Sequence, residues 1–169
     1  MVRERKQIKT AVVDKTLQIV TFTVGAEEYG LDISSITEVI RPLPVTPLPH
    51  MPRFIEGVIN LRGVIIPVVD LRKRFGLAGE RGNLRTIRML IVRGAAKGKL
   101  GLVVDGVREV LLVPPSSIAA APEAATGAGV DFIAGVVKAA ERLVVLINIE
   151  RILSREERAS LTEAGDVPA

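Results

Sequence analysis

Residues 54–71 read Phe-Ile-Glu-Gly-Val-Ile-Asn-Leu-Arg-Gly-Val-Ile-Ile-Pro-Val-Val-Asp-Leu, two apolar, β-branched runs on either side of an Arg-Gly pair. Such runs around a tight turn are typical of a β-hairpin. The pattern returns in the second half of the chain, where 132–136 match 54–58 and the apolar run 143–149 matches 65–71 with the same spacing. Asp70 falls on Asn148, and each is expected to cap a helical turn. The sequence therefore predicts an internally duplicated β fold.

The duplication extends upstream with a slightly shorter spacing. Residues 30–39 recur as 101–110, with a Gly-Leu pair and a Glu-Val pair kept. Residues that both halves keep are most simply those that build a shared fold. Residues 60–63, Asn-Leu-Arg-Gly, are not kept, because their counterpart at 138–141 is Lys-Ala-Ala-Glu. The Arg-Gly pair is therefore a candidate for a function that only one half carries.

Short strands account for most of the chain. They are expected at 17–24, 28–33, 36–40, 55–60 and 64–69 in the first half, and at 86–92, 100–104, 107–113, 133–137 and 143–147 in the second. Regular spacing of this kind favours an all-β fold built from barrels or sandwiches. Ser154 followed by Glu157 has capping-box spacing and predicts a short C-terminal helix at 154–164. Residues 1–14 and 165–169 are expected to be tails.

The composition limits the classes of function. The chain has 169 residues, 48% of them apolar and only 3% aromatic, so Val, Ile and Leu must fill its core. The absence of cysteine excludes disulfides, and no apolar run is long enough to span a bilayer, so we expect a cytoplasmic protein without direct membrane insertion. The net charge of +4 raises nucleic acid as a partner, but a chain with no Trp and one Tyr lacks platforms for base stacking. No nucleic acid partner is expected.

Residues suited to catalysis or metal binding are scarce. The one histidine, His50, has no nucleophile or orienting carboxylate at a recognisable spacing. Residues 94–99 resemble a phosphate-binding loop, but their glycine spacing is one residue short and Lys99 precedes Leu100 instead of Ser or Thr. No spacing suits zinc or calcium. We therefore expect no catalytic residue, no metal and no cofactor, which leaves binding.

The Arg62 side chain projects from a short turn beside apolar strands and needs a carboxylate. Glu38 is the candidate, because it belongs to the same half and lies across the Pro-rich connection. An Arg–Glu pair in a partly shielded groove is directional, which makes it useful for fixing the register of a partner. Two alternatives stay open. Glu38 recurs as Glu109, so its role could be purely structural, and Arg62 could be a solvated turn residue.

The order of these segments resembles the CheW family of bacterial chemotaxis coupling proteins. The run 54–71 carries the resemblance, and further matches lie at 28–31, 38–40, 47–49, 102–107, 132–136 and 146–150. Together they cover about residues 15–155. The resemblance implies two SH3-like five-stranded β-barrels related by a pseudo-twofold around a shared hydrophobic core. The barrels are expected at about 15–83 and 84–153, with an exchange of strands between them allowed.

The resemblance also implies a function. Such proteins are non-catalytic adaptors that join the cytoplasmic tip of methyl-accepting chemoreceptors to the regulatory domain of the histidine kinase CheA, which shares the double-barrel fold. The receptor tip, a helical hairpin, is expected in the groove between the subdomains, while adaptor and kinase dock barrel to barrel. We expect a monomer in solution that joins receptor arrays. The alternatives are an adaptor of another chemosensory kinase pathway and, more remotely, a basic SH3-like nucleic-acid-binding module.

Carried onto this chain, the family's functional motif and its apolar neighbours fall in the first half, on Ile36, Glu38, Gly57, Val58, Asn60, Arg62 and Gly63. A helical hairpin in a groove needs apolar contacts and a charge that sets its register, which suits Ile36 with Arg62. A barrel–barrel joint needs edge strands or apolar barrel ends, and Leu31 and Ile33 are the candidates. Which residues face the receptor and which face the kinase stays open.

Overall fold

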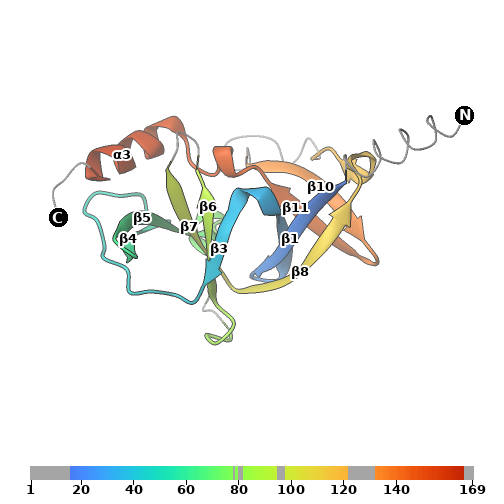
Figure 1. Cartoon of the computed structure of the whole chain (residues 1–169), viewed down its shortest axis with the longest axis horizontal. Coiled ribbons are helices and arrows are strands. Elements are labelled where there is room, and N and C mark those ends of the chain that lie inside the picture. Colours follow the sequence, from blue (N-terminus) through green and yellow to red (C-terminus); the bar gives the residue numbers. More distant parts are fainter. Residues whose placement is uncertain (1–15, 78, 80–81, 95–97, 122–131, 166–169) are drawn as a thin grey trace, which may run out of the picture.

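Two β-sheets form the fold in the computed structural model, which describes residues 16–77, 79, 82–94, 98–121 and 132–165 (Figure 1). The tails expected at 1–14 and 165–169 lie outside this range, apart from Gly165. The five-stranded sheet has the order β3-β6-β7-β5-β4, with strands at Ile36–Ile40, Arg88–Arg93, Lys99–Val104, Val64–Asp70 and Ile55–Leu61. The six-stranded sheet has the order β8-β1-β2-β11-β10-β9, at Gly106–Val113, Leu17–Val24, Glu27–Asp32, Arg142–Ile147, Ile133–Ala139 and Ile118–Ala119.

The all-β expectation is confirmed, and each of the ten expected strands lies within two residues of its predicted ends. The six-stranded sheet has one strand more than expected, the two-residue β9. Its counterpart in the other sheet is an isolated bridge between Thr46 and Val58. The helices are α2 at Leu71–Arg74 and α3 at Arg155–Gly165, with 3₁₀ turns η1, η3 and η5 at Ile33–Ser35, Pro115–Ser117 and Ile149–Arg151.

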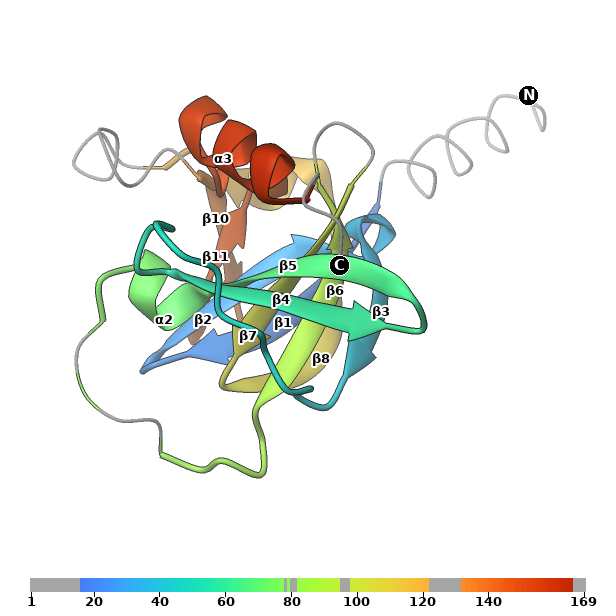
Figure 2. The same cartoon turned by 90° about the vertical axis from the view of Figure 1, so that its left-hand side faces the viewer.

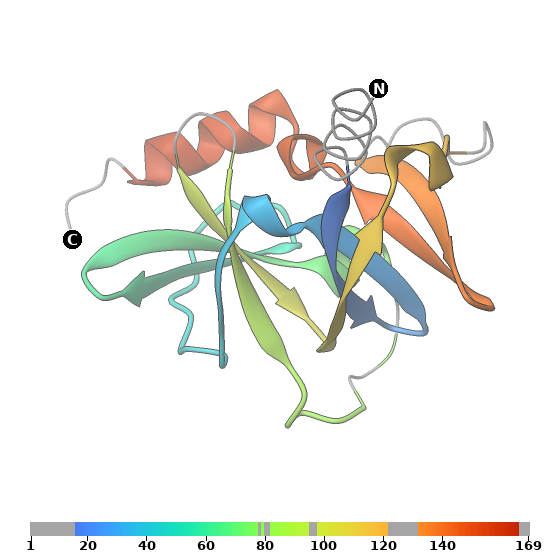
Figure 3. The ribbon, with the colours of Figure 1, turned by 45° about the vertical axis from the view of Figure 1, so that its right-hand side comes forward.

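The sheets do not follow the two halves of the sequence. Hairpin β1–β2 pairs with strands of the second half, and hairpin β6–β7 pairs with strands of the first (Figure 3). The strand exchange that the barrel prediction at 15–83 and 84–153 allowed is therefore present, with one sheet from 36–70 and 88–104 and another from 17–32 and 106–147. The cause is parallel pairing of β5 with β7 and of β11 with β2. Hydrophobic periodicity locates strands but does not identify their partners.

The register of these parallel pairs shows that the repeat in sequence is a repeat in structure. Val68 lies opposite Gly101, and Leu146 lies opposite Gly30. Leu146 is the sequence equivalent of Val68, and Gly101 is the sequence equivalent of Gly30, so the two pairs are the same pair formed twice. The pseudo-twofold therefore relates the two sheets, each completed by a hairpin from the other half.

Apolar side chains form three clusters, one on the inside of each sheet and one in the space between the two sheets. The largest cluster lies between the sheets and takes residues from both, including Phe22, Leu31, Leu90, Leu102, Phe132 and Ile152. A second cluster, with Ile59, Ile66 and Ile91, lies inside the five-stranded sheet, and a third, with Ile19, Val137 and Val144, lies inside the six-stranded sheet. The shared core expected between two barrels is thus confirmed.

Arg74 ties the two repeats together where they meet. Its Nε donates a hydrogen bond of 2.8 Å to the carbonyl of Ile152, which occupies the position equivalent to Arg74 in the second repeat. Its guanidinium carbon lies 4.8 Å from the ring centroid of Phe54 and 5.5 Å from that of Phe132, which are also equivalent. The Arg74 guanidinium is therefore placed close to the pseudo-twofold, where one cation serves both repeats.

Helix α3 lies over the five-stranded sheet and begins at the predicted capping box (Figure 1). The Glu157 amide donates to the Ser154 hydroxyl at 3.1 Å, and the Ser154 amide donates to the Glu157 carboxylate at 2.7 Å. These reciprocal bonds satisfy amides that a helix start leaves free. In the part of the chain that the structure describes, no helix has the length and apolar character that crossing a membrane requires.

Candidate functional site

The tip of hairpin β4–β5 has a backbone fixed by its turn. Leu61 lies opposite Val64, so Arg62 and Gly63 are the two turn residues, with φ angles of 52° and 88°. Two positive φ angles match the right-handed twist of the flanking strands, and only glycine adopts them without steric cost. The Gly63 amide donates to the Asn60 side-chain oxygen at 2.8 Å. This bond holds the turn that presents Arg62.

The expected partner of Arg62 is present. The Arg62 guanidinium donates a hydrogen bond to the Glu38 carboxylate on β3, and the two side chains form an ion pair. Figure 2 shows the hairpin tip projecting beside β3. The ion pair therefore connects β3 with the tip across the open end of the sheet. The Arg62 side chain is 67% exposed and that of Glu38 is 28% exposed. The pair is therefore ordered by the fold and still open to a partner.

Each residue of this ion pair favours the charged form of the other. The hydrogen bond from Arg62 holds the pKa of the Glu38 carboxyl below its ordinary value, although desolvation opposes this, and the positive charges of Arg62 and Lys99 act in the same direction as the bond. The hydrogen bond to Glu38 likewise raises the pKa of the Arg62 guanidinium. Both shifts favour the charged forms of the two side chains.

Gly57 and Val58 lie farther along β4 and belong to a strand crossing. A Cβ atom on Gly57, whose φ is 142°, would lie 2.0 Å from the carbonyl oxygen of Thr46. Thr46 and Val58 exchange two backbone hydrogen bonds of 2.8 and 2.9 Å at this crossing. The equivalent Gly135 would meet the Ala119 carbonyl at 2.8 Å. This close approach explains why both halves carry glycine here, without any contribution from a partner.

The apolar candidates divide into accessible and buried residues. Leu31 is only 1% exposed and packs in the core between the sheets, so its assignment as a kinase-facing residue is corrected. Leu31 and its equivalent Leu102 are both core residues, which is the reason the repeat keeps them. Ile33, on η1, is exposed, and Ile36 is half-buried against the same core. Only Ile33 of these candidates offers a substantial apolar surface to a partner.

Three exposed apolar residues that the sequence patterns did not single out lie on the strands near the tip, one of them, Val39, on the face of β3 opposite to Glu38. Val64 and Ile65 follow the turn on β5, and Val39 follows Glu38 on β3, and all three are exposed apolar side chains. A comparison of the repeats position by position identifies one of them. Val64 corresponds to Arg142, so it is apolar in one half and charged in the other. The hairpin tip therefore has exposed apolar side chains beside its ion pair.

A groove separates β3 from β8, the edge strands of the two sheets. It encloses about 410 Å³ and is lined by apolar Val39 and Val107 together with Arg85, Arg88 and Arg108. Because side chains alternate along a strand, Glu38 and its neighbour Val39 point to opposite faces of β3. Glu38 reaches the hairpin tip while Val39 lines the groove. One short strand thus contributes to both surfaces.

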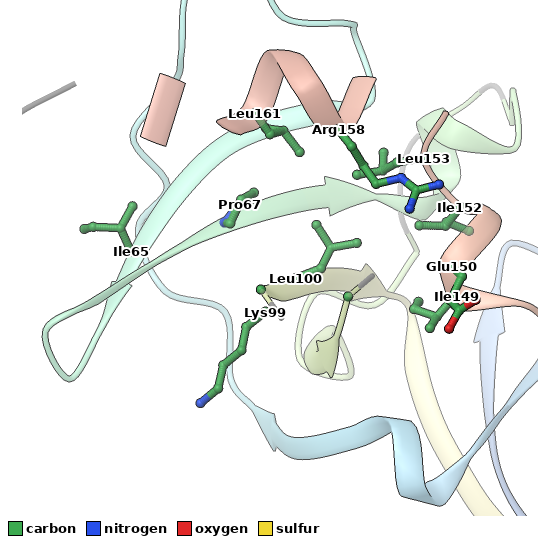
Figure 4. Close-up of a pocket in the computed structure, with 12 residues that line it drawn as sticks. Ile65, Pro67, Lys99, Leu100, Ile149, Glu150, Ile152, Leu153, Arg158 and Leu161 are labelled. Carbon is green, nitrogen blue, oxygen red and sulfur yellow. The ribbon is translucent and has the colours of Figure 1, made fainter. Parts of the chain in front are cut away.

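Reactive chemistry is scarce in the described residues. Within them, no three His, Cys, Asp or Glu side chains gather as a metal site. A cavity of about 240 Å³ beneath α3 is lined mainly by apolar residues such as Leu100, Leu153 and Leu161 (Figure 4). Its charged residues, Lys99, Glu150 and Arg158, do not form a nucleophile and base. The arrangement is suited to docking.

Comparison with known proteins assigns the family. The model of the CheW-like domain matches residues 18–157. The chain is 39% identical to a chemotaxis protein CheW of Klebsiella aerogenes, covering 84% of each protein, and 32% identical to one of Treponema pallidum, covering 92% of this chain and 93% of that one. The crystal structure of scaffolding protein TtCheW from Thermoanaerobacter tengcongensis superposes with a TM-score of 0.76 at 39% identity, covering 84% of this chain and 95% of that chain. With this match over most of its length, the chain belongs to the CheW family.

Proposed function

We propose that this chain is a non-catalytic adaptor that joins the cytoplasmic tip of methyl-accepting chemoreceptors to the regulatory domain of the histidine kinase CheA. The role places it in the cytoplasm, at receptor arrays. Family membership supports the class of function. The observation that carries the proposal is a preorganised turn with an accessible ion pair and flanking apolar residues, which can bind a protein but has no group to react with one.

The hairpin tip is suited to the kinase. Two barrels dock through barrel ends or edge strands, and β4 is an edge strand that ends at this tip. Val64 and Ile65 supply apolar contact area, while Arg62 supplies direction. This assignment moves Arg62 from the receptor groove, where the sequence analysis had it beside Ile36, to the kinase side.

The groove between β3 and β8 is suited to the receptor. A helical hairpin binds with an apolar stripe, and the groove offers Val39 and Val107 at its walls. Both interfaces are of modest size, about 1,000–1,500 Å² in total each, as in transient signalling complexes. Avidity within an array makes such contacts sufficient.

Strand β3 provides a route for coupling between the two partners. Glu38 touches the kinase-side site and Val39 the receptor-side groove, so a receptor state that shifts β3 also shifts the carboxylate that orients Arg62. Coupling requires that the receptor bind the two positions of β3 with different affinity. Because Glu38 and Val39 are adjacent in the chain, the route needs no intervening residue.

Calorimetry with the isolated regulatory domain of the cognate CheA tests the proposal. Arg62→Ala and Glu38→Ala should each weaken kinase binding by about tenfold, and the double variant should lose less than the sum because the residues act as a pair. Val39→Asp should weaken binding of a receptor-tip fragment instead. Absence of wild-type binding at tens of micromolar would reject the kinase partner. Binding only to the kinase of another chemosensory pathway would select the alternative adaptor role.

A further inference from the structure

Charged residues stand at the open end of each sheet, beside the tip of its hairpin. We call these sets the five-stranded mouth, formed by Glu38, Arg62, Arg93 and Lys99, and the six-stranded mouth, formed by Glu28, Arg108, Glu109 and Arg142. Two positions are equivalent in the duplication, since the spacing that relates 30–39 to 101–110 also relates Glu38 to Glu109 and Glu28 to Lys99. The first position keeps its carboxylate, and the second reverses its charge.

The six-stranded mouth is neutral and internally paired. Arg142 contacts two carboxylates, those of Glu109 and of Glu28, whose Oε2 lies 2.9 Å from Arg142 Nε. The contact with Glu28 is an ion pair and not an aligned hydrogen bond, since Nε has no acceptor of its own. Arg108 lies 3.4 Å from the same Glu28 oxygen. Two cations and two carboxylates balance, and Glu28 is only 7% exposed.

The five-stranded mouth has the same frame but an excess of cations. Lys99 of β7 lies directly opposite Arg93 of β6. Two residues earlier on β6, Ile91 lies between Glu38 of β3 and Gly101 of β7. The alternation of side chains puts Glu38, Arg93 and Lys99 on one face. Figure 4 shows the Lys99 side chain pointing away from the cavity beneath α3. Three cations and one carboxylate leave two positive charges here.

These cations lack the second carboxylate that the other mouth has. Among the described residues, Arg62 forms its ion pair with Glu38 alone, and neither Arg93 nor Lys99 forms one. Arg62 remains 67% exposed, whereas Arg142, held by two carboxylates, is 34% exposed. Within this part of the chain, the position that carries Glu28 in one mouth carries Lys99 in the other, so the five-stranded mouth has one carboxylate for three cations.

We propose that Lys99 and Arg62 bind an acidic side chain of the kinase regulatory domain, which supplies the five-stranded mouth with the second carboxylate that Glu28 supplies in the six-stranded mouth. The inference rests on the proposed function and names the chemistry of its kinase contact. A guanidinium fits a carboxylate with directed hydrogen bonds, while an ammonium adds a point charge without demanding a fixed geometry. Arg62 therefore sets the register, and Lys99 and Arg93 attract the carboxylate and speed its encounter.

Charge reversal at Lys99 tests this inference by calorimetry and stopped-flow binding with the cognate kinase regulatory domain. Lys99→Glu places a carboxylate where the six-stranded mouth has one, so Arg62 gains an internal partner and the acidic group of the kinase is repelled. Kinase binding should weaken by about tenfold or more, mainly through a slower association rate, and Lys99→Gln should have a smaller effect. Raising the salt concentration should weaken wild-type binding more than Lys99→Gln binding.

Lys138→Glu is the matched control. Lys138 is an exposed residue of β10 in the other sheet, so this variant makes the same change in net charge away from the five-stranded mouth. It should leave kinase binding within about twofold, since a distant exposed charge is screened at physiological salt. If wild-type protein binds and both Lys99 variants bind equally well, or if Lys138→Glu weakens binding as much, the inference is wrong. Loss of wild-type binding itself would instead overturn the proposed function.

Discussion

Gly57→Ala distinguishes a residue that shapes the site from one that touches a partner. A methyl group at this position would stand 2.0 Å from the Thr46 carbonyl oxygen and 2.8 Å from the Pro47 Cα, both backbone atoms that cannot rotate away. The φ of 142° is a second obstacle, because L side chains rarely adopt it. The crossing segment must therefore move, and the two hydrogen bonds between Thr46 and Val58 are broken or stretched.

The magnitude follows from these two effects. Overpacking of a tight site costs about 1–3 kcal/mol, and backbone strain at an unfavourable φ costs about 1–3 kcal/mol, so Gly57→Ala should destabilise the fold by about 2–6 kcal/mol. Gly63→Ala is the matched control on the same hairpin. Gly63 also has a positive φ, 88°, but an added Cβ would meet nothing within 4 Å, so strain alone remains, at about 1–2 kcal/mol.

Urea unfolding followed by far-UV circular dichroism measures the difference, since the chain has no tryptophan to report by fluorescence. At about 2–4 °C per kcal/mol, Gly57→Ala should also lower the melting temperature by about 10 °C. Kinase binding is then measured where each variant is folded. If Gly57→Ala is no less stable than Gly63→Ala, the strand-crossing explanation is wrong, and a loss of binding by a stable Gly57→Ala would identify a contact residue.

Other predictions concern the ion pair, the helix cap and the junction of the repeats. Carbon-13 NMR should show the Glu38 carboxyl titrating below its ordinary pKa, and this pKa should rise in Arg62→Gln. Because the pKa of Glu38 is lowered in the folded state, the ion pair adds stability at pH values above the pKa of an unfolded carboxyl. That stability is lost as the pH falls through the folded pKa. Ser154→Ala should cost about 1 kcal/mol of stability in urea unfolding, because the Glu157 amide loses its acceptor. Arg74→Met should cost about 2–3 kcal/mol in the same assay, through loss of a charged hydrogen bond and ring contacts.

Much of the fold was predictable because its determinants are local. The β-branched runs located the strands, and the equivalent residues Asp70 and Asn148 cap their helical turns as expected, accepting from Arg72 and Glu150 amides at 2.9 and 3.0 Å. The exchange of hairpins was not predictable from these patterns. It depends on which strand lies parallel to β5, and an apolar run such as β7 suits either sheet equally well.

The site was predictable only in part, for a related reason. The difference between the repeats at Arg62 led to its pairing with Glu38, because a lone guanidinium beside apolar strands needs a carboxylate. Burial could not be inferred in the same way, so Leu31 was selected although it lies in the core. In the sequence, Lys99 is distinguished only by its place in a loop that resembles a phosphate loop. The role proposed for Lys99 is recognised only by comparing its charge with that of Glu28, its equivalent in the other half.

The physical difference between core and mouth explains how the two halves diverged. Residues at strand crossings and caps cannot change without cost, so Gly57 and Gly135 are the same residue at equivalent crossings. A solvent-exposed charge such as Lys99 is different, since replacing it alters stability by only about 0.5 kcal/mol. Lys99 can therefore oppose Glu28 in sign while the backbone register of both sheets is kept. A duplicated scaffold thus retains one mouth whose charges are satisfied internally and one whose charges are satisfied by a partner.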